Sequence, residues 1–562
     1  MPSCSSLHFS AWTNSVLVIA SLWAALVPVR AACQATNSPQ PAASAEYRVT
    51  GTVVSKSDGH PLDHAGIALV DVKSRKNAHT MITSEDGKFV FDGLPAGKYA
   101  LSGQRKGYIN AGYDSHEQFS TAIVTGAELS TENLVLRLAP AGLIVGKVLD
   151  ESGEPVRHAM VTVYFEDHSS GVGRVQQFRS AQTDDQGEYE ATSLLPGAYF
   201  VSASATPWYA VHPGTPVQTP GLATISVDRS LDVTYPLTYY GDVTEADSAS
   251  PIPIRGGEHM QADIQMSPVH ALSMRFHVPE DGQNGFQVPQ LLQIGFDGSA
   301  NFVQGTGMTM VSPGIMEITG IPEGKYNVRL NGQGTAAQVS GLDLTKENQE
   351  LDLSTAEALS NVKISVNIPG EIELPRGGVV ALRSGRRVPI AVQQVNAKGK
   401  AQLEQVPPGV YDVMVWNFGK PYSVDHMEAE GARAQGRKVT IASGSSPSIS
   451  LTLVSGDSQV HGVVQRAGKG IGGAMVVLAP KDPVLHRDLF RRDQSDLDGT
   501  FSLLGIVPGS YTIFAIENGW ELNWSEPSAI APYLKRGRSV QIAGHSGQPV
   551  DLGDPIEVQS IK

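Results

Sequence analysis

The chain has 562 residues, which is too long for one hydrophobic core and predicts several domains. Its 58 Gly and 35 Pro exceed average usage while only 17% of its residues are charged, a composition typical of a turn-rich, all-β, extracytoplasmic protein. The net charge of −14 is spread thinly along the chain, which argues for solubility and against nucleic acid as a partner.

The N-terminal segment 1–31 is expected to be a signal peptide. Residues 15–29, SVLVIASLWAALVPV, form an apolar run of the length of a signal h-region, although no Lys or Arg precedes it. Val29 and Ala31 then supply the small residues of a cleavage site. We therefore expect a secreted, periplasmic or cell-surface protein.

The mature chain is expected to hold at most one thiol. Cys4 lies inside the expected signal peptide, and Cys33 lies in the linker 32–45 that follows it. The sequence leaves open whether Cys33 stays in the mature chain or carries a lipid, although Arg30 stands where a lipid-attachment motif requires Leu. No internal disulfide is possible, so each domain depends on its own core. No other segment approaches the ~18 apolar residues of a membrane-spanning helix.

One phrase, with Pro, Gly and Tyr in the same order, occurs five times along the chain. Its copies read DGLPAGKYAL, SLLPGAYFV, GIPEGKYNV, QVPPGVYDV and GIVPGSYTI, and their tyrosines are Tyr99, Tyr199, Tyr326, Tyr411 and Tyr511. The spacings of 100, 127, 85 and 100 residues fit a tandem array of independent domains rather than a solenoid. We number the expected domains as modules one to five, with the ranges 46–139, 140–268, 269–357, 358–455 and 456–562.

The residues around each phrase predict β-strands. In module one, Phe89 and Phe91 before the phrase and Tyr99 within it alternate with polar neighbours, the pattern of half-buried strands. Asp86-Gly87 provides turn chemistry before these strands, and Pro and Gly shape the connection between them. The Leu and Tyr of the first phrase, DGLPAGKYAL, are therefore expected to enter a core. About seven short strands per module predict a β-sandwich.

The wider pattern resembles the carboxypeptidase regulatory-like domain of secreted bacterial proteins, which is related to starch-binding-like and Cna B-type sandwiches. It reads G-x-V, a turn with G-x-P, A-x-V-x-V, T-D-x-x-G-x-F/Y and L-P-x-G-x-Y. The resemblance is strong in modules one, two and five, at Gly51, Pro61, Ala65, Asp86, Gly87, Phe89, Pro95, Gly97, Tyr99, Gly146, Pro155, Ala159, Asp184, Gly187, Tyr189, Pro196, Gly197, Tyr199, Gly462, Ala474, Asp496, Gly499, Phe501, Pro508, Gly509 and Tyr511.

The resemblance implies a transthyretin-like (prealbumin-like), Ig-like sandwich in each module. Modules three and four match only in the last hairpin and are interpreted as degenerate copies. Both lack the Asp-rich turn, and module four has NAKGKAQL in its place. The likeness is to the accessory domain of carboxypeptidases, not to their catalytic domain, so it does not imply an enzyme.

Catalytic and metal motifs are weak in this sequence. His277 and Glu280 form the H-x-x-E of a zinc carboxypeptidase, but Pro279 interrupts it and no distant His has a catalytic setting. His60 and His64 have a spacing of four, but they lie in a turn, so the two rings need not share a face. A metal-dependent hydrolase centred on His277 and Glu280 is therefore only a distant alternative.

Two Asp-rich turns resemble the start of a calcium loop. They are Asp184-Asp185 and Asp496-Leu497-Asp498-Gly499. The Glu that closes a calcium loop is missing from both, and Asp before Gly is ordinary turn chemistry. We therefore expect no enzyme activity, no bound metal and no cofactor.

Aromatic residues in loops are the best candidates for ligand binding. Tyr108, Trp208 and Trp520 each follow the Tyr of their own module by nine residues. Two interpretations stay open: these rings cap the end of a sandwich, because large aromatics supply much buried area, or they form an exposed platform for sugar rings. The candidate ligand-binding residues are Trp208, Tyr209, Tyr235, Tyr239, Tyr240, Trp520 and Trp524.

The sequence thus predicts a non-catalytic, multi-module binding protein. A polysaccharide or a cell-surface glycan is the first choice of partner. The alternative is a structural spacer or adhesion stalk, in which the repeats only set a length. The ligand, any surface anchor and the oligomeric state are not defined by the sequence.

Overall fold

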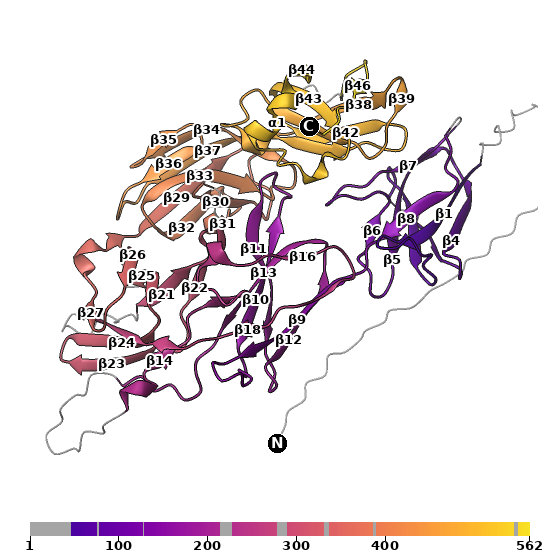
Figure 1. Cartoon of the computed structure of the whole chain (residues 1–562). Coiled ribbons are helices and arrows are strands. Elements are labelled where there is room, and N and C mark those ends of the chain that lie inside the picture. Colours follow the sequence, from indigo (N-terminus) through magenta and orange to yellow (C-terminus); the bar gives the residue numbers. More distant parts are fainter. Residues whose placement is uncertain are drawn as a thin grey trace, which may run out of the picture. The chain divides into compact units, whose positions relative to one another are not determined.

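The computed structural model describes residues 46–561, apart from 76–77, 127–128, 214–227, 278–288, 331–335, 386–388 and 544–548. The expected signal peptide, the linker and both cysteines lie outside the described residues. The regular secondary structure of the described chain is almost all β-strand, as predicted, and its one α-helix is α1 (Pro527–Leu534) (Figure 1).

Module one is formed by two sheets. The first has the strand order β4-β1-β8, with β4 (Lys88–Leu94), β1 (Tyr47–Ser55) and β8 (Leu134–Leu138). The second has the order β3-β2-β5-β6, with β3 (Ala78–Ile82), β2 (Gly66–Asp71), β5 (Gly97–Gln104) and β6 (Ala111–Gly112), and β7 (Ile123–Thr125) also pairs with β5. Strand β1 runs antiparallel to β4 and parallel to β8, so the first and last strands of the module are neighbours.

Module two repeats this plan. One sheet consists of β12 (Glu188–Leu194), β9 (Gly142–Leu149), β17 (His259–Gln261) and β18 (Ile264–Gln265). The other consists of β11 (Arg174–Gln182), β10 (Met160–Asp167), β13 (Gly197–Ser204), β15 (Thr238–Tyr239) and β16 (Ile252–Ile254). A separate two-stranded ladder joins β14 (Val233–Thr234) to β19 (Val269–His270).

Modules three and four have the same two-sheet plan despite their divergent sequences. The sheets of module three are β23 (Gly307–Ser312), β24 (Ile315–Ile321), β20 (Leu272–His277) and β27 (Gln349–Glu350), and β22 (Ala300–Phe302), β21 (Gln290–Ile294), β25 (Gly324–Leu330), β26 (Ala337–Leu344) and β28 (Glu357–Ala358). Those of module four are β32 (Lys400–Val406), β29 (Ser360–Asn367), β37 (Ser448–Ser455) and β34 (Tyr422–Glu430), and β31 (Pro389–Gln394), β30 (Val379–Arg383), β33 (Gly409–Trp416), β36 (Lys438–Ile441) and β35 (Arg433–Gln435).

Module five adds a helical cap to the plan. Its sheets are β39 (Lys469–Gly470), β38 (Ser458–Arg466), β42 (Thr500–Ile506), β45 (Val550–Asp551) and β46 (Ile556–Glu557), and β41 (Arg491–Gln494), β40 (Met475–Pro480), β43 (Gly509–Ile516) and β44 (Arg538–Ile542). Between β43 and β44 the chain forms a short 3-10 helix, Gly519–Glu521, and then α1. Both pack on the outer face of β40 and β43, where they bury Trp520 and Ile530.

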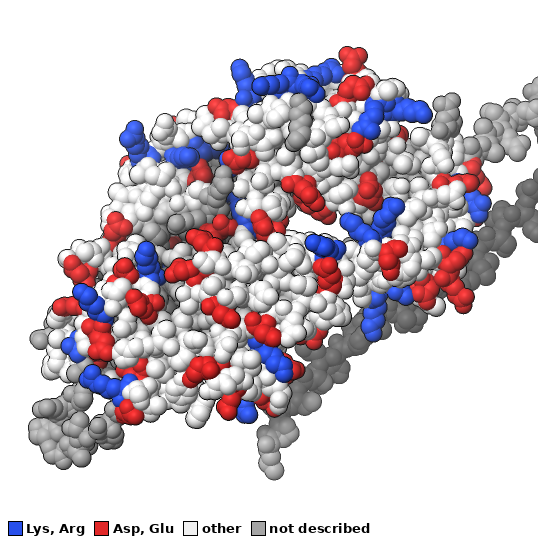
Figure 2. All heavy atoms as spheres, in the orientation of Figure 1, with Lys and Arg blue, Asp and Glu red and all other residues white. Residues whose placement is uncertain are grey.

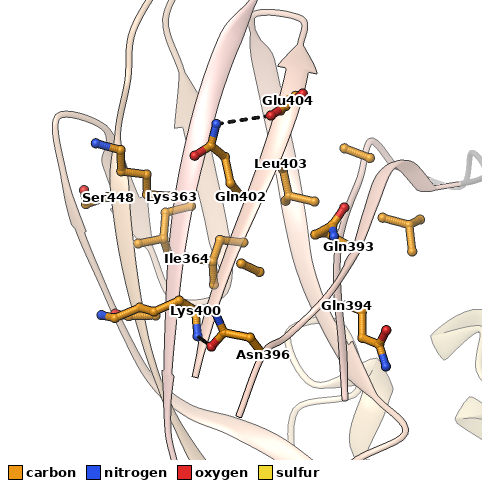
Figure 3. A pocket seen from close by; sticks show the side chains of 15 residues that line it. Lys363, Ile364, Gln393, Gln394, Asn396, Lys400, Gln402, Leu403, Glu404 and Ser448 are labelled. Atoms are coloured by element: carbon orange, nitrogen blue, oxygen red, sulfur yellow. Dashed lines mark hydrogen bonds between the residues drawn. The ribbon is translucent and has the colours of Figure 1, made fainter. Parts of the chain in front are cut away.

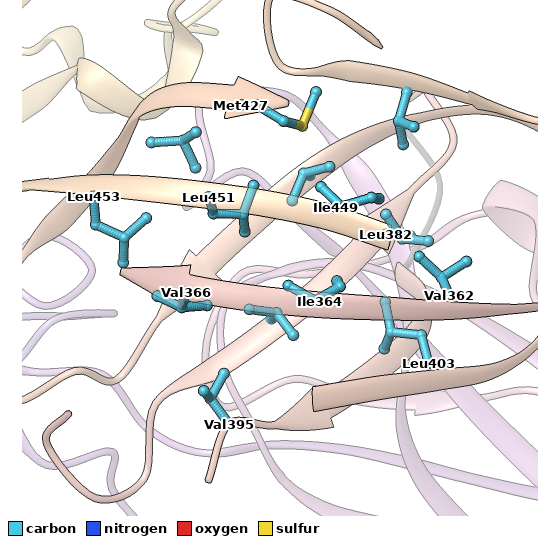
Figure 4. Close-up of a cluster of buried hydrophobic side chains, with 14 of the residues drawn as sticks. Val362, Ile364, Val366, Leu382, Val395, Leu403, Met427, Ile449, Leu451 and Leu453 are labelled. Carbon is cyan, nitrogen blue, oxygen red and sulfur yellow. The ribbon is translucent and has the colours of Figure 1, made fainter. Parts of the chain in front are cut away.

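Each module encloses its own hydrophobic core. In module four, the residues of β29 alternate between buried and more exposed positions. Ile364 and Val366 therefore lie on the buried face of the sheet, which they share with Leu451 and Leu453 of the neighbouring strand β37 (Figure 4). A fully buried side chain of this size contributes about 1.5–3 kcal/mol relative to exposure. Such clusters can stabilise each sandwich without disulfides.

The five landmark tyrosines have one common geometry. All are buried, and each hydroxyl donates a hydrogen bond to the carbonyl oxygen four residues earlier, at 2.7–3.0 Å. The ring thus enters the core while its one polar atom is paired, which avoids the cost of an unsatisfied buried hydroxyl. The prediction that the Leu and Tyr of the phrase enter a core is confirmed, with Leu94 and Tyr99 at 0% and 3% exposure.

The turn that module four was expected to lack is present in a different chemical form. In module two, Asp184 Oδ1 accepts hydrogen bonds from the backbone N–H groups two and four residues later, both at 2.9 Å. In module four, Asn396 Oδ1 makes the same pair of bonds at 3.0 Å. The following Gly187 and Gly399 both have positive φ, 71° and 74°. An amide oxygen replaces the carboxylate because the turn needs only an acceptor.

Candidate ligand-binding surface

Trp208 is the most exposed large aromatic side chain among the candidates. It lies in the loop after β13, in a turn that the Ala210 N–H closes by donating to the Pro207 carbonyl oxygen at 3.0 Å. Its side chain is 85% exposed, and its ring meets Tyr209 edge to face, with 5.6 Å between the centroids. Since an indole usually buries most of its surface, this ring offers apolar area that nothing in the described chain covers.

A carboxylate lies beside this aromatic pair. Glu151 accepts hydrogen bonds from the Tyr209 hydroxyl and, at 3.1 Å, from the Tyr235 hydroxyl. Burial alone would raise the pKa of Glu151, but the two tyrosine hydroxyls hold that pKa below its usual value, so the group is charged at neutral pH. Burial and the carboxylate raise the pKa of Tyr209 to about 12, so Tyr209 keeps its proton as a donor.

The other tyrosines of the module two insert face inward. Tyr235 is 5% exposed and belongs to the core of module two, and the half-buried Tyr240 packs against the same core. Tyr239 is 1% exposed and contacts Phe296 of module three, with 5.3 Å between the ring centroids. Tyr235 reaches the candidate surface only through its hydroxyl, and Tyr239 and Tyr240 have structural positions.

Trp520 is covered by module one. Its side chain is 8% exposed, its indole N–H donates to the Gly473 carbonyl oxygen at 3.2 Å, and its ring stacks on His116 with 4.8 Å between centroids and 5° between planes. Phe119 adds a second ring contact at 5.6 Å. Trp520 therefore has the capping position, and it presents no free face to a sugar ring.

Trp524 belongs to the same contact between modules one and five. Its half-buried ring lies 4.1 Å from the guanidinium carbon of Arg492, a cation–π distance. Arg492 is only 3% exposed and forms a two-point ion pair with Glu117 of module one, at 2.5 and 3.2 Å. Lys98 of module one also pairs with Asp496 of module five. The first and last modules are thus in direct contact.

Two parts of these surfaces were missed by the sequence reasoning. Glu151 lies in the first turn of module two, ESGEP, where Gly and Pro indicate only a turn. His116 and Glu117 are neighbours in the chain but far from Arg492 and Trp520, and no local pattern links the two pairs. The one available indication was the aromatic position nine residues after the landmark Tyr of modules one, two and five, which leads to Trp208 and Trp520 but does not reveal their burial.

The histidines of the weak metal motifs have carboxylate partners. His277 Nε2 lies 2.8 Å from Glu350, with both side chains about two-thirds exposed, while Glu280 lies outside the described residues. His60 and His64 pair with the carboxylates of Asp58 and Asp63. Among the described residues, no group of three or more His, Cys, Asp or Glu could hold a metal ion.

A polar groove of about 990 Å³ lies at the edge of module four, where β31 and β32 approach each other (Figure 3). Gln393, Gln394, Gln402 and Lys400 line it, and Gln402 donates to Glu404 at 3.3 Å. The groove has amide and ammonium groups but no aromatic side chain in its lining. It therefore lacks the stacking surface that Trp208 offers.

The charged side chains do not form one broad field on the visible face. Figure 2 shows acidic and basic groups singly or in small clusters, with wide uncharged areas between them. This distribution matches the low share of charged residues, 17%. Of the helices in the described ranges, none has the length and apolar character needed to cross a bilayer.

Solved structures with similar arrangements have low identity and low TM-scores. They include the Bacillus anthracis TIE protein, at 11% identity and TM-score 0.18, covering 74% of this chain and 75% of that one. The minor pilin GBS52 of Streptococcus agalactiae has 13% identity and TM-score 0.21, covering 40% and 96%. The shaft pilin SpaA of Lactobacillus rhamnosus GG has 11% identity and a TM-score of 0.19, and the match covers 40% of this chain and 98% of that one. These values are too low to assign the chain to the family of any of these proteins.

The sequence comparisons identify part of the chain. No curated protein matches it significantly. Two segments, residues 48–132 and 144–228, match the carboxypeptidase regulatory-like domain family. These segments cover the landmark phrases at Tyr99 and Tyr199 and the turns at Asp86 and Asp184, while module five, where the resemblance was also strong, is not among the matched segments. The chain therefore contains two carboxypeptidase regulatory-like domains, in modules one and two.

Proposed function

We propose that this protein is a non-catalytic, extracytoplasmic binding protein that recognises carbohydrate through the loop after β13 in module two. Trp208 and Tyr209 provide the aromatic surface, and Glu151 provides a charged acceptor beside it. The apolar C–H face of a pyranose can stack on the indole, while its hydroxyls donate to the carboxylate.

The observation that carries the proposal is the 85% exposure of Trp208 next to a paired carboxylate. An exposed indole in a loop of a rigid sandwich has no stabilising role in the described chain, and such loops are the usual place of binding residues. Glu151 is held by two tyrosine hydroxyls, so its acceptor oxygens stay in position before a ligand arrives.

The experiment is a pull-down of the full mature chain with a set of insoluble polysaccharides, followed by affinity measurement for any that binds. We expect Trp208→Ala to weaken binding by about tenfold or more, because stacking on one aromatic ring contributes about 1–3 kcal/mol. Glu151→Gln should weaken it less, since the amide oxygen still accepts one hydrogen bond.

The matched control is Phe302→Ala. Phe302 is also a strongly exposed aromatic, 66%, but it lies on β22 of module three and is not part of the loop after β13. Normal binding by Phe302→Ala together with loss in Trp208→Ala supports the proposal. Equal binding by all variants, or binding to none of the polysaccharides, would sink it.

A structural spacer is the second candidate function. The repeated sandwiches favour it, because a tandem array can set a distance. The ion pairs Arg492–Glu117 and Lys98–Asp496 join the first module to the last, so the number of modules does not by itself set a length. Binding is therefore the first choice.

A further inference from the structure

A basic cavity of about 1150 Å³ lies where residues of modules two, four and five meet. Eight Lys and Arg side chains line it against two Asp side chains, in a chain whose net charge is −14. Its volume is slightly above the ~300–1,000 Å³ typical of small-molecule sites. This concentration of positive charge contrasts with the negative net charge of the whole chain.

Two arginines in this cavity have an Nε–H group without an acceptor among the described residues. Arg174 comes from β11 of module two and Arg383 from the end of β30 in module four, and the Nε atoms of both are buried without an acceptor. Burial and the like charges of Arg174 and Arg487 lower the pKa of Arg383. A buried N–H group without an acceptor is costly, and an anion that enters the cavity could accept a hydrogen bond from it.

The neighbouring carboxylates, Asp412 and Asp488, offset only part of the positive charge, because the net effect of the surroundings still lowers the pKa of Arg383. Asp488 is occupied by Arg437, with which it forms an ion pair, and by the Ser423 hydroxyl. Asp412 lies opposite Arg383 in the β30–β33 ladder and is the other carboxylate in the lining. Arg491 donates only to backbone carbonyl oxygens. The cavity therefore keeps an excess of positive charge.

The lining also includes aromatic surface. Trp416 ends β33 and Tyr422 begins β34, and both side chains are half-buried. The Tyr422 hydroxyl is buried without a partner among the described atoms. A single inorganic ion would leave these rings and most of the volume unused, whereas an acidic sugar combines anionic groups with apolar C–H faces.

We propose that this cavity binds an acidic oligosaccharide, whose carboxylate or sulfate groups pair with Arg174 and Arg383 and whose rings lie against Trp416 and Tyr422. Guanidinium forks match the two oxygens of a carboxylate or sulfate, which favours arginine over lysine at such a site. The proposal adds a substrate class to the proposed function, but it concerns a separate cavity and does not need Trp208.

The test is calorimetric titration of the full mature chain with oligogalacturonate and with a sulfated heparin-derived oligosaccharide. Maltohexaose is the neutral control and a polyglutamate peptide the non-saccharide control. We expect one or both acidic sugars to bind more weakly as salt rises from about 50 to about 500 mM, because screening reduces the attraction. Arg383→Gln and Arg174→Gln should each weaken binding by roughly ten- to a hundredfold.

Two further variants keep the test decisive. Arg376→Gln changes an exposed residue of the lining, so it should fold normally and weaken binding by a smaller factor. Arg433→Gln changes an exposed arginine of β35 in the same module that is not part of the lining, and it should bind like the parent. Trp208→Ala should also leave this binding intact, which separates the two sites.

Three outcomes would overturn the inference. They are no binding of either acidic sugar at about 1 mM, equal binding by the Arg383, Arg376 and Arg433 variants, and a preference for polyglutamate over both sugars. The last result would assign the cavity to acidic peptides instead. If the parent chain binds no polysaccharide in the pull-down, the proposal for Trp208 fails, whereas this one is still tested by the calorimetric titration.

Discussion

Trp208 and Trp520 have the same place in their modules and opposite surroundings. Each follows its landmark Tyr by nine residues, in the loop that leaves the same strand of the sandwich. Trp208 is 85% exposed, while Trp520 is 8% exposed beneath His116 and Phe119 of module one. An equivalent position therefore determines where a ring lies in the fold, and the neighbouring module determines whether it can meet a ligand.

The largest expected effect is a loss of stability on substitution of Trp520, the buried member of this pair. Trp520→Ala should destabilise module five by about 3–5 kcal/mol, because it leaves a large cavity between α1, β40, β43 and module one. Trp208→Ala should stay within about 0.5 kcal/mol of the parent, since its side chain is exposed. Urea unfolding followed by far-UV circular dichroism measures both. Equal destabilisation by the two substitutions would break the comparison.

The second effect concerns the ion pair that covers Trp520. Glu117→Gln should destabilise the contact by about 2–3 kcal/mol, because Arg492, which is 3% exposed, loses its carboxylate partner. Glu521→Gln is the matched control, since Glu521 is exposed beside Trp520 and has no ion pair among the described residues. Scanning calorimetry should show a lower unfolding temperature for the first variant alone. If both variants melt like the parent, the pair does not hold the modules together.

The third expected effect is a pH dependence of stability, which arises at the contact that covers Trp520 and not at the exposed Trp208. Burial raises the pKa of Asp493, next to Arg492, from 3.8 to about 6. Between these values the folded state binds more protons than the unfolded state, so stability falls as pH rises from about 4 to about 6, by on the order of 2 kcal/mol. Urea unfolding at both pH values checks this change. In Asp493→Asn the difference should shrink, and an unchanged difference would contradict the assignment.

Much of the fold could be predicted from the sequence because its determinants are local. Alternation around Phe89 and Tyr99 indicates strands, and the repeated Pro-Gly-Tyr phrase marks each hairpin. The same local reasoning missed the turn of module four, because Asn396 can accept the two backbone hydrogen bonds that Asp184 accepts in module two. Modules three and four thus keep the central strand order of the first sheet, as β24-β20-β27 and β32-β29-β37, and each adds one edge strand to it, β23 or β34.

The candidate site was less predictable because its determinants are distant in the chain. The exposed Trp208 was among the predicted ligand-binding residues, but the carboxylate of Glu151 reaches it only through folding of the first turn of module two. Trp520 was predicted to bind ligand on the same grounds as Trp208. Its burial depends on His116 and Glu117, which lie roughly four hundred residues earlier in the chain. Local periodicity contains no information about such contacts.

The parallel pairing of first and last strands has a kinetic consequence. In module one β1 lies beside β8, and in module five β38 lies beside β46. No sandwich can close until its final strand has been synthesised, and such long-range pairing is slow, about milliseconds to seconds. Module one can close early, but its contact with Trp520 forms only after module five has folded. Until then the rings of His116 and Phe119 lack their contact with Trp520, and this surface is open to a chaperone or a second chain.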